Sequence, residues 1–316
     1  MSEESSIALG VSQCLLGHEV RYDGGHKHSS YITGVLGPFC RFVPVCPEVE
    51  AGFGIPREPI RLEGEPEQPR VISQKTRREL TLPLQEAAGR LVGALADEGL
   101  CGFILKRDSP SCGLERVRVY RENGMPVQQG VGIFAQALGA AFPLLPIEEE
   151  GRLNDAALRE NFIERVFVYQ RWRELLENPS AQALVAFHTR HKFLIMAHSP
   201  THMRQLGGVT GGMQKGGDLP LDAYGALLME GLKRLATPKK NVDALMHMMG
   251  FLKAHLSADE KAEMLELLDA YRAERIPLIV PITLLNHYVR KFAPPYLSGQ
   301  WYLHPHPLEL KLRNHA

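Results

Sequence analysis

The first half of this 316-residue chain alternates short apolar runs with helical patterns, and this alternation restricts the folds open to it. Four runs have the length and the bounding turn residues of strands: 7–12, 42–46, 102–106 and 142–147. Apolar residues recurring at three- and four-residue spacing predict a helix over 82–98, and a second helix is expected over 131–142. Strands joined by such long crossovers pair in parallel, with helices on the faces of the sheet. The pattern therefore predicts an α/β domain with a parallel sheet.

Charge and chemistry divide the chain into two parts. Residues 1–150 contain 15 Lys+Arg and 20 Asp+Glu, a net charge of −5, whereas residues 151–316 contain 21 and 16, a net charge of +5. All five cysteines precede residue 113, and ten of the 13 histidines follow residue 150. This contrast predicts two domains, 1–150 and 151–316, with a boundary within 146–155. From residue 155 onward the apolar spacing is helical, so the second domain is expected to be all-α.

The composition is that of a soluble globular protein, 44% hydrophobic and 23% charged. No apolar stretch reaches the roughly 20 residues that span a bilayer. The acidic N-terminus "MSEESSIALG" lacks a basic-then-apolar signal pattern, so a cytoplasmic protein without a membrane partner is expected. In that compartment, five cysteines are expected to be free, metal-bound or catalytic rather than paired in disulfides.

The positions of the cysteines relative to the predicted strands separate them into two groups. Cys14, Cys46 and Cys112 lie at or just after strand ends, whereas Cys40 and Cys101 lie just before strands. Open parallel sheets bind ligands outside the carboxyl ends of their strands. Three thiols are therefore expected to converge at the functional edge of the sheet, with the other two at the opposite edge.

Two kinds of metal centre suit three convergent thiols. A closed structural zinc site needs a fourth ligand, which His26 or His28 of "GGHKHS" could supply. The alternative is a 4Fe–4S cluster held by three cysteines, with one iron left open as a Lewis acid that favours sulfur donors. The residues by themselves leave both possibilities open.

The segments "VSQCLLGHEVRYDGGHK", "PVCPEVEAGFGIPREPIRL" and "ILKRDSPSCG" closely resemble the signature segments of the thiouracil desulfidase family. The resemblance covers about residues 5–150. It implies a Rossmann-like α/β domain that binds a 4Fe–4S cluster through Cys14, Cys46 and Cys112. It also implies that Glu48 is the catalytic acid/base and that Ser109 is the active-site serine. The implied reaction is hydrolysis: water attacks the thiocarbonyl carbon of a thiolated pyrimidine, Glu48 handles the proton, and sulfur leaves as hydrosulfide.

Three basic residues near these segments are further candidates. Arg21, Arg57 and Lys106 could meet the phosphate or ribose of a substrate, and a structural ion pair is the alternative for each.

The second half contains two windows without acidic residues, 178–217 and 275–308, in which basic and aromatic side chains are mixed. Such a mixture suits a phosphate backbone and unstacked bases. The alternative is a solvated basic face with the aromatic rings in the core of a helical bundle. The four histidines of the first window have no cysteine or carboxylate beside them, which does not favour a metal site there. The candidate RNA contacts are Arg190, Lys192, Arg204, Arg290, Lys291 and Trp301.

The segments "FHTRHKFLIMAHSPTHMRQLGG" and "NHYVRKFAPPYLSGQWYLHPHPLELKLRN" resemble a small all-helical domain of unassigned chemistry that occurs alone or fused behind desulfidase domains. The fused arrangement resembles bacterial desulfidases that act on 4-thiouridine in tRNA. We therefore expect a 4Fe–4S-dependent tRNA desulfidase whose partner is RNA rather than DNA. The alternatives are a desulfidase of free thiouracil or thiouridine monophosphate, and a non-catalytic, zinc-stabilised RNA-binding protein.

Overall fold

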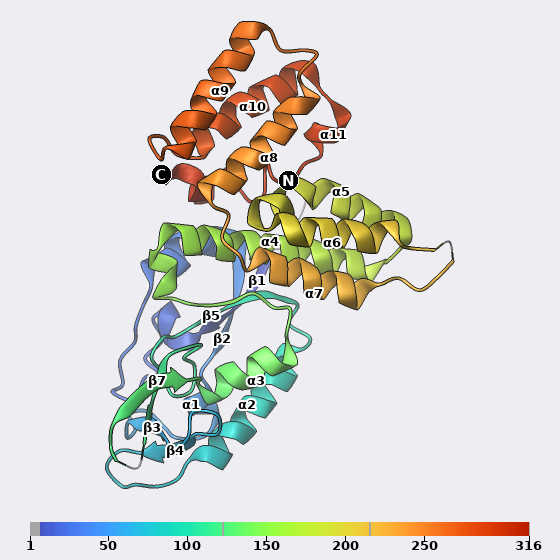
Figure 1. Ribbon diagram of the computed structural model, residues 1–316. Helices are drawn as coiled ribbons and strands as arrows, with labels where there is room; N and C mark the ends of the chain where they lie inside the picture. Colours follow the sequence, from blue (N-terminus) through green and yellow to red (C-terminus); the bar gives the residue numbers. More distant parts are fainter. Residues whose placement is uncertain (1–6, 122, 215, 316) are drawn as a thin grey trace. The chain divides into compact units, whose positions relative to one another are not determined.

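The structure, a computed structural model, describes residues 7–121, 123–214 and 216–315. The chain folds as two compact units, Met1–Asn154 and Asp155–Ala316 (Figure 1). The division falls four residues after the domain end expected at 150. The first unit is α/β with a parallel sheet and the second is all-helical, as the sequence predicts.

The parallel sheet of the first unit has the strand order β2-β1-β5-β8. β1 and β5 are buried at every residue because they are central strands with both faces covered, which explains their uninterrupted apolar sequences. β2 lies at an edge, where the missing N–H of Pro44 is tolerated. The strand predicted at 142–147 is wrong over most of its length, because the strand begins only at its last residue. The strands are β1 Ile7–Ser12, β2 Cys40–Val45, β5 Leu100–Leu105 and β8 Ile147–Glu149.

A second sheet, of order β4-β3-β6-β7, was not predicted. Its strands are four or five residues long, and each has too few inward-facing side chains to produce a recognisable alternation. β3 and β6 pair in parallel, whereas the outer strands pair antiparallel to them. Ile60, Leu62, Val117 and Val119 of the two central strands pack with Leu84 in one hydrophobic core. The strands are β3 Ile60–Glu63, β4 Arg70–Ser73, β6 Val117–Tyr120 and β7 Pro126–Gly130.

The helices of the first unit are α1 Pro47–Glu50, α2 Thr81–Leu95 and α3 Ile133–Ala141. α2 and α3 match the two predicted helices to within three residues and pack against each other (Figure 1). Within the parallel sheet, the ring of Phe103 lies against Gly10, where a Cβ atom would be only 2.1 Å from a ring carbon. β1 therefore needs a glycine at this position to pack against β5.

The second unit consists of helices and turns throughout its described residues. α9 begins with a capping box between Ser257 and Glu260. α6 contains three glycines, so its sequence carries little helical signal. No helix in the described ranges is both long and apolar enough to cross a membrane. The helices are α4 Ala156–Glu177, α5 Ala181–His198, α6 Pro200–Gly211, α7 Leu221–Leu232, α8 Pro238–Phe251, α9 Ala258–Arg272, α10 Ile279–Phe292 and α11 Pro295–Ser298.

Candidate functional site

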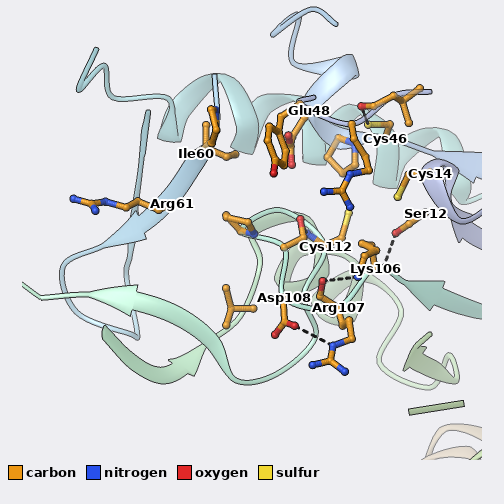
Figure 2. Close-up of a pocket in the computed structure, with 18 of the residues that line it drawn as sticks. Ser12, Cys14, Cys46, Glu48, Ile60, Arg61, Lys106, Arg107, Asp108 and Cys112 are labelled. Atoms are coloured by element: carbon orange, nitrogen blue, oxygen red, sulfur yellow. Dashed lines mark hydrogen bonds and ion pairs between the residues drawn. The ribbon is translucent and has the colours of Figure 1, made fainter. Parts of the chain in front are cut away.

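Three cysteines lie at the carboxyl ends of three adjacent strands. Cys14 lies in a 3₁₀ turn directly after β1, Cys46 follows β2 and caps α1, and Cys112 lies in the turn after β5. Since these strands are neighbours in the order β2-β1-β5, their ends meet at one edge of the sheet. All three cysteines line one cavity of about 520 Å³ (Figure 2).

The three thiols are free and largely removed from water. Burial, reinforced by the neighbouring Cys46, raises the pKa of Cys14 to about 11. Burial also raises the pKa of Cys46, and that of Cys112 well above its ordinary value. Buried thiols in such surroundings become thiolates when a cationic centre binds them. Three soft donors facing one cavity therefore form a donor set that fits a metal–sulfur centre.

The two remaining cysteines lie away from this cavity. Cys40 is the first residue of β2, and Cys101 is the second residue of β5, so both lie at the amino ends of their strands. Neither lines the cavity. The positions of the cysteines relative to the predicted strands predict this separation.

The turn that contains Cys112 is anchored by the start of α3. The backbone N–H of Ile133 donates to the carbonyl of Pro110 (3.1 Å), and that of Phe134 donates to the carbonyl of Ser111 (2.9 Å). These bonds satisfy amides that a helix N-terminus otherwise leaves unpaired. A Cβ at Gly132 would lie 2.5 Å from the carbonyl oxygen of Ser111, so the contact requires a glycine.

Glu48 lies in α1, two residues after Cys46, and its carboxylate lines the cavity. Arg57 donates to its Oε2 from Nε at 2.8 Å and from Nη2 at 2.7 Å. The hydroxyl of Ser111 donates to Oε1. Arg57 is itself held by the carbonyls of Val20 and Gly54. The carboxylate is thus fixed in orientation on both of its oxygens.

Ser109 is connected to Glu48 through Ser111. The Ser109 hydroxyl oxygen accepts the backbone N–H groups of Ser111 and Cys112, both at 3.2 Å, and lies 3.3 Å from the Ser111 hydroxyl. Ser109, Ser111 and Glu48 therefore form one line of hydrogen bonds. The sequence reasoning missed Ser111, although it occupies the position directly before a predicted cysteine ligand.

The other predicted basic residues also line the cavity, and each is paired with a carboxylate. Lys106 donates to Glu150 at 2.5 Å, and the Nε of Arg21 lies 3.4 Å from Asp23. The predicted role of Arg21, Arg57 and Lys106 in binding substrate stays a prediction. Each of the three also forms a structural ion pair within the fold, which is the alternative role that the sequence leaves open.

The zinc alternative requires a histidine near the cysteines. Neither His26 nor His28 lines the cavity, and the ring of His28 bonds instead to the hydroxyl of Thr33 at 2.9 Å. Over the ranges that the structure describes, no three His, Cys, Asp or Glu side chains form a site for a single metal ion. A 4Fe–4S cluster binds each cysteine to a different iron, so three separated thiols suit it better than they suit zinc.

The predicted RNA contacts lie in several parts of the second unit. The guanidinium carbons of Arg171 and Arg190 lie 3.7 and 4.5 Å from the ring centre of Trp301. Lys291 is ion-paired with Glu260 at 2.9 Å. Arg204 and Arg290 are exposed and Lys192 is half-buried. These roles stay predictions.

Each histidine of the first acid-free window has a partner within the fold. His188 contacts the hydroxyl of Tyr224, His191 contacts the carbonyl of Phe187, and His202 contacts the hydroxyl of Ser199. His198 contacts Glu164. These contacts give the four rings structural roles.

A parallel sheet with three cysteines and a carboxylate at its carboxyl edge defines the class: an α/β domain with a thiol-lined site at the edge where such sheets bind ligands. Residues 9–150 match the model of the 2-thiouracil desulfurase family, and residues 192–307 match that of a protein of unknown function, DUF1722. YbbK of Bacillus subtilis (strain 168) is 32% identical to this chain over 108 residues, which are 33% of this chain and 71% of YbbK. The chain therefore belongs to the 2-thiouracil desulfurase family through its N-terminal unit.

Two further relatives are similar to this chain. YbgA of Escherichia coli (strain K12) is 28% identical over 153 residues, which are 48% of this chain and 90% of YbgA. The solved 4Fe-4S-dependent thiouracil desulfidase TudS is 31% identical, with 47% of this chain and 93% of TudS covered and a TM-score of 0.39.

Proposed function

We propose that this chain is an iron–sulfur-dependent desulfidase that converts 4-thiouridine in tRNA to uridine and releases hydrosulfide. The observation that carries the proposal is the convergence of three cysteines and Glu48 on one cavity at the carboxyl edge of the sheet. Membership of the 2-thiouracil desulfurase family supports the reaction type. A relative of 31% identity that is described as 4Fe-4S-dependent supports the cofactor.

In this proposal Cys14, Cys46 and Cys112 hold a 4Fe–4S cluster as thiolates, while their burial protects the centre from water. When bound, the cluster supplies an iron without a protein ligand, a Lewis acid toward the sulfur of a thiocarbonyl group. The remaining steps belong to side chains of this chain.

Glu48 takes a proton from the water that attacks the thiocarbonyl carbon. A C–O bond forms, the C–S bond breaks, and the sulfur leaves as hydrosulfide, so no electron enters or leaves. Arg57 and Ser111 fix the carboxylate toward the cavity. The line from Ser109 through Ser111 gives the proton on Glu48 a route back to the substrate.

The tRNA part of the proposal rests on the second unit. Residues 151–316 have a net charge of +5, which attracts a polyanion. Arg190 and Trp301 combine a cation with an aromatic ring at one place, the chemistry that holds unstacked bases. The thiolated base must leave the stack to reach a recessed site, so the RNA is locally opened or the base is flipped.

The first experiment uses anaerobically reconstituted protein and bulk tRNA that contains 4-thiouridine. Nucleoside mass spectrometry should show loss of 4-thiouridine with the wild type and none with Glu48→Gln at equal iron content. If neither protein removes sulfur although the cluster is intact, the desulfidase function is wrong. A colourless anaerobic preparation that still binds RNA would favour the zinc-stabilised alternative.

A second experiment tests the role of the helical unit. Replacing Arg290 and Lys291 together by glutamate should weaken tRNA binding and reduce its dependence on salt, because each lost phosphate contact lowers the salt slope by about one. Turnover of free 4-thiouridine should be unaffected. An equal fall in nucleoside turnover would contradict this division of labour.

The second candidate is a desulfidase of free thiouracil or thiouridine monophosphate, and the description of the matching family names thiouracil. Conversion of these small substrates together with untouched tRNA would establish it in place of the tRNA reaction.

A further inference from the structure

The helical unit contains a cavity of about 220 Å³ that the proposed desulfidase function does not use. Side chains of α4, α5, α8 and α9 line it, together with residues from the loops that follow α7 and α9, so it lies entirely within the unit Asp155–Ala316. Drug-sized ligands occupy cavities of about 300–1,000 Å³. This cavity therefore suits a smaller molecule.

The side-chain oxygen of Asn161 is left without a hydrogen-bond donor in this cavity. Asn161 lies in α4 and is only 6% exposed. Its Nδ2 donates to the carbonyl of Leu232 at 2.8 Å, which fixes the orientation of the amide. Its Oδ1 accepts no hydrogen bond within the ranges that the structure describes, and it keeps some accessible surface, so it faces the cavity. Because a buried carbonyl oxygen without a donor is costly, this atom is suited to a ligand that donates a hydrogen bond.

Three carboxylates, those of Glu160, Glu164 and Glu274, line the same cavity. Arg313 lies 3.4 Å from Glu160 and 2.7 Å from Glu164, and each of these two carboxylates also contacts a histidine ring. Glu274, which follows α9, is exposed and has no ion-pair partner in the described part of the chain. With the histidines counted as neutral, three carboxylates face one arginine, although the surrounding residues 151–316 have a net charge of +5. A recess with surplus negative charge attracts cations.

The rest of the lining combines one fixed hydroxyl with apolar surface. The hydroxyl of Tyr271 accepts from Nδ2 of Asn241 at 2.9 Å, and Oδ1 of Asn241 accepts from the hydroxyl of Tyr302 at 2.9 Å. Burial raises the pKa of Tyr271 to about 12, so its hydroxyl stays neutral. The Tyr271 oxygen keeps a second lone pair for a ligand. Leu235 and Leu278 supply carbon surface to the same cavity.

The charge and the acceptors of the lining together decide the class of ligand. An anion would be repelled by the surplus of carboxylates. A neutral alcohol could donate to Asn161 but would gain nothing from the negative charge. A protonated amine meets both conditions, because it has N–H donors and a positive charge. An aliphatic chain on that amine matches the apolar part of the lining.

We propose that the cavity of the helical unit is a binding site for a small aliphatic ammonium ion. Its N–H groups donate to Oδ1 of Asn161 and to the hydroxyl oxygen of Tyr271, and its carbon chain lies against Leu235 and Leu278. The carboxylates of the lining supply the opposite charge, with Glu274 as the unpaired one. The site is separate from the cysteine-lined cavity and does not rest on the desulfidase function.

The test compares two probes of the same length, 1-aminobutane and 1-butanol, on the full-length protein by calorimetry at constant ionic strength and near-neutral pH. The amine should bind at least about tenfold more tightly than the alcohol, the gain expected for a charge-assisted hydrogen bond. Equal binding of the two probes, or binding of inorganic phosphate in place of the amine, would overturn the proposal. Neither probe needs a cluster or a thiolated base, so failure here and failure of the desulfidase function are distinguishable.

Two variants place the amine in this cavity. Asn161→Ala removes the buried acceptor and should weaken binding of 1-aminobutane about tenfold or more, with urea unfolding as the check that the unit still folds. Glu274→Gln removes only an exposed charge and should weaken binding about 2- to 5-fold, without an effect on 1-butanol. The matched control Glu266→Gln, an exposed carboxylate of α9 outside the lining, should change nothing. Unchanged binding in both Asn161→Ala and Glu274→Gln, or an equal loss in Glu266→Gln, would contradict the site.

Discussion

The three thiols of the first unit and the buried carboxylate of the second unit differ in whether they are paired. In the first unit, three thiols at the sheet edge face a cavity, and no disulfide joins them. In the second unit, the buried carboxylate of Glu164 accepts from His198 at 2.9 Å and from Arg313 at 2.7 Å. The other ring nitrogen of His198 lies 2.6 Å from the carbonyl of Arg234. Polar groups that satisfy one another stabilise a fold, whereas groups left facing a cavity are available to a ligand.

The largest effect is expected from removing a cysteine ligand. Cys112→Ser should abolish cluster absorbance and desulfuration while leaving the thermal stability of the cluster-free protein close to that of the wild type. The matched variant Cys40→Ser, at the amino end of β2, should keep both cluster and activity. An active, cluster-loaded Cys112→Ser protein would contradict the assignment of Cys112 as a ligand, because its thiol would then have only a structural role.

The complementary change belongs to the second unit. Glu164→Ala leaves buried His198 without its carboxylate and leaves buried Arg313 with only Glu160, at 3.4 Å. The loss should lower the free energy of unfolding by about 3–5 kcal/mol. Urea unfolding measures this loss. Glu230→Ala removes an exposed pair with Lys233 and should change stability by less than about 1 kcal/mol. If the two variants were equally stable, the buried network would not stabilise the unit.

A smaller effect is expected at Ser111, which we regard as a positioning residue for Glu48. Ser111→Ala removes one of the contacts that orient the carboxylate, and kcat should fall about 10- to 100-fold with KM and iron content unchanged. Steady-state kinetics at matched cluster content measure the change. A rise in KM at constant kcat would instead indicate that Ser111 contacts the substrate.

The smallest effect concerns pH. The ion pair of His315 with Glu160, at 2.7 Å, raises the pKa of the histidine. Its stabilising contribution is therefore fully present below the unfolded pKa of about 6.5 and is lost as the pH rises through the higher folded value. The Tm difference between wild type and His315→Gln should be larger at pH 5.5 than at pH 8.5, and it should be modest because the pair is partly exposed. A difference independent of pH would contradict the ion pair.

Much of the first unit could be predicted because its signals are local. β1 runs from Ile7 to Ser12, where an apolar run ends at a turn, and α2 follows an apolar stripe. Cys14 and Cys112 each come just after a strand, and a parallel sheet aligns the carboxyl ends of its strands. Their positions in the sequence therefore predict that both lie at the carboxyl edge of the sheet. The family resemblance, not the spacing, assigned Glu48 and Ser109.

The second sheet and the pairing of charges could not be predicted in this way. Arg61 and Arg118 are 57 positions apart, and only the parallel pairing of β3 with β6 brings them side by side. Likewise, Glu48 meets Ser111 across 63 positions. Sequence patterns report local periodicity and the residue types available for chemistry. Contacts between distant segments exist only after the sheets have formed. These contacts decide which carboxylate neutralises which cation and which polar group is left for a ligand.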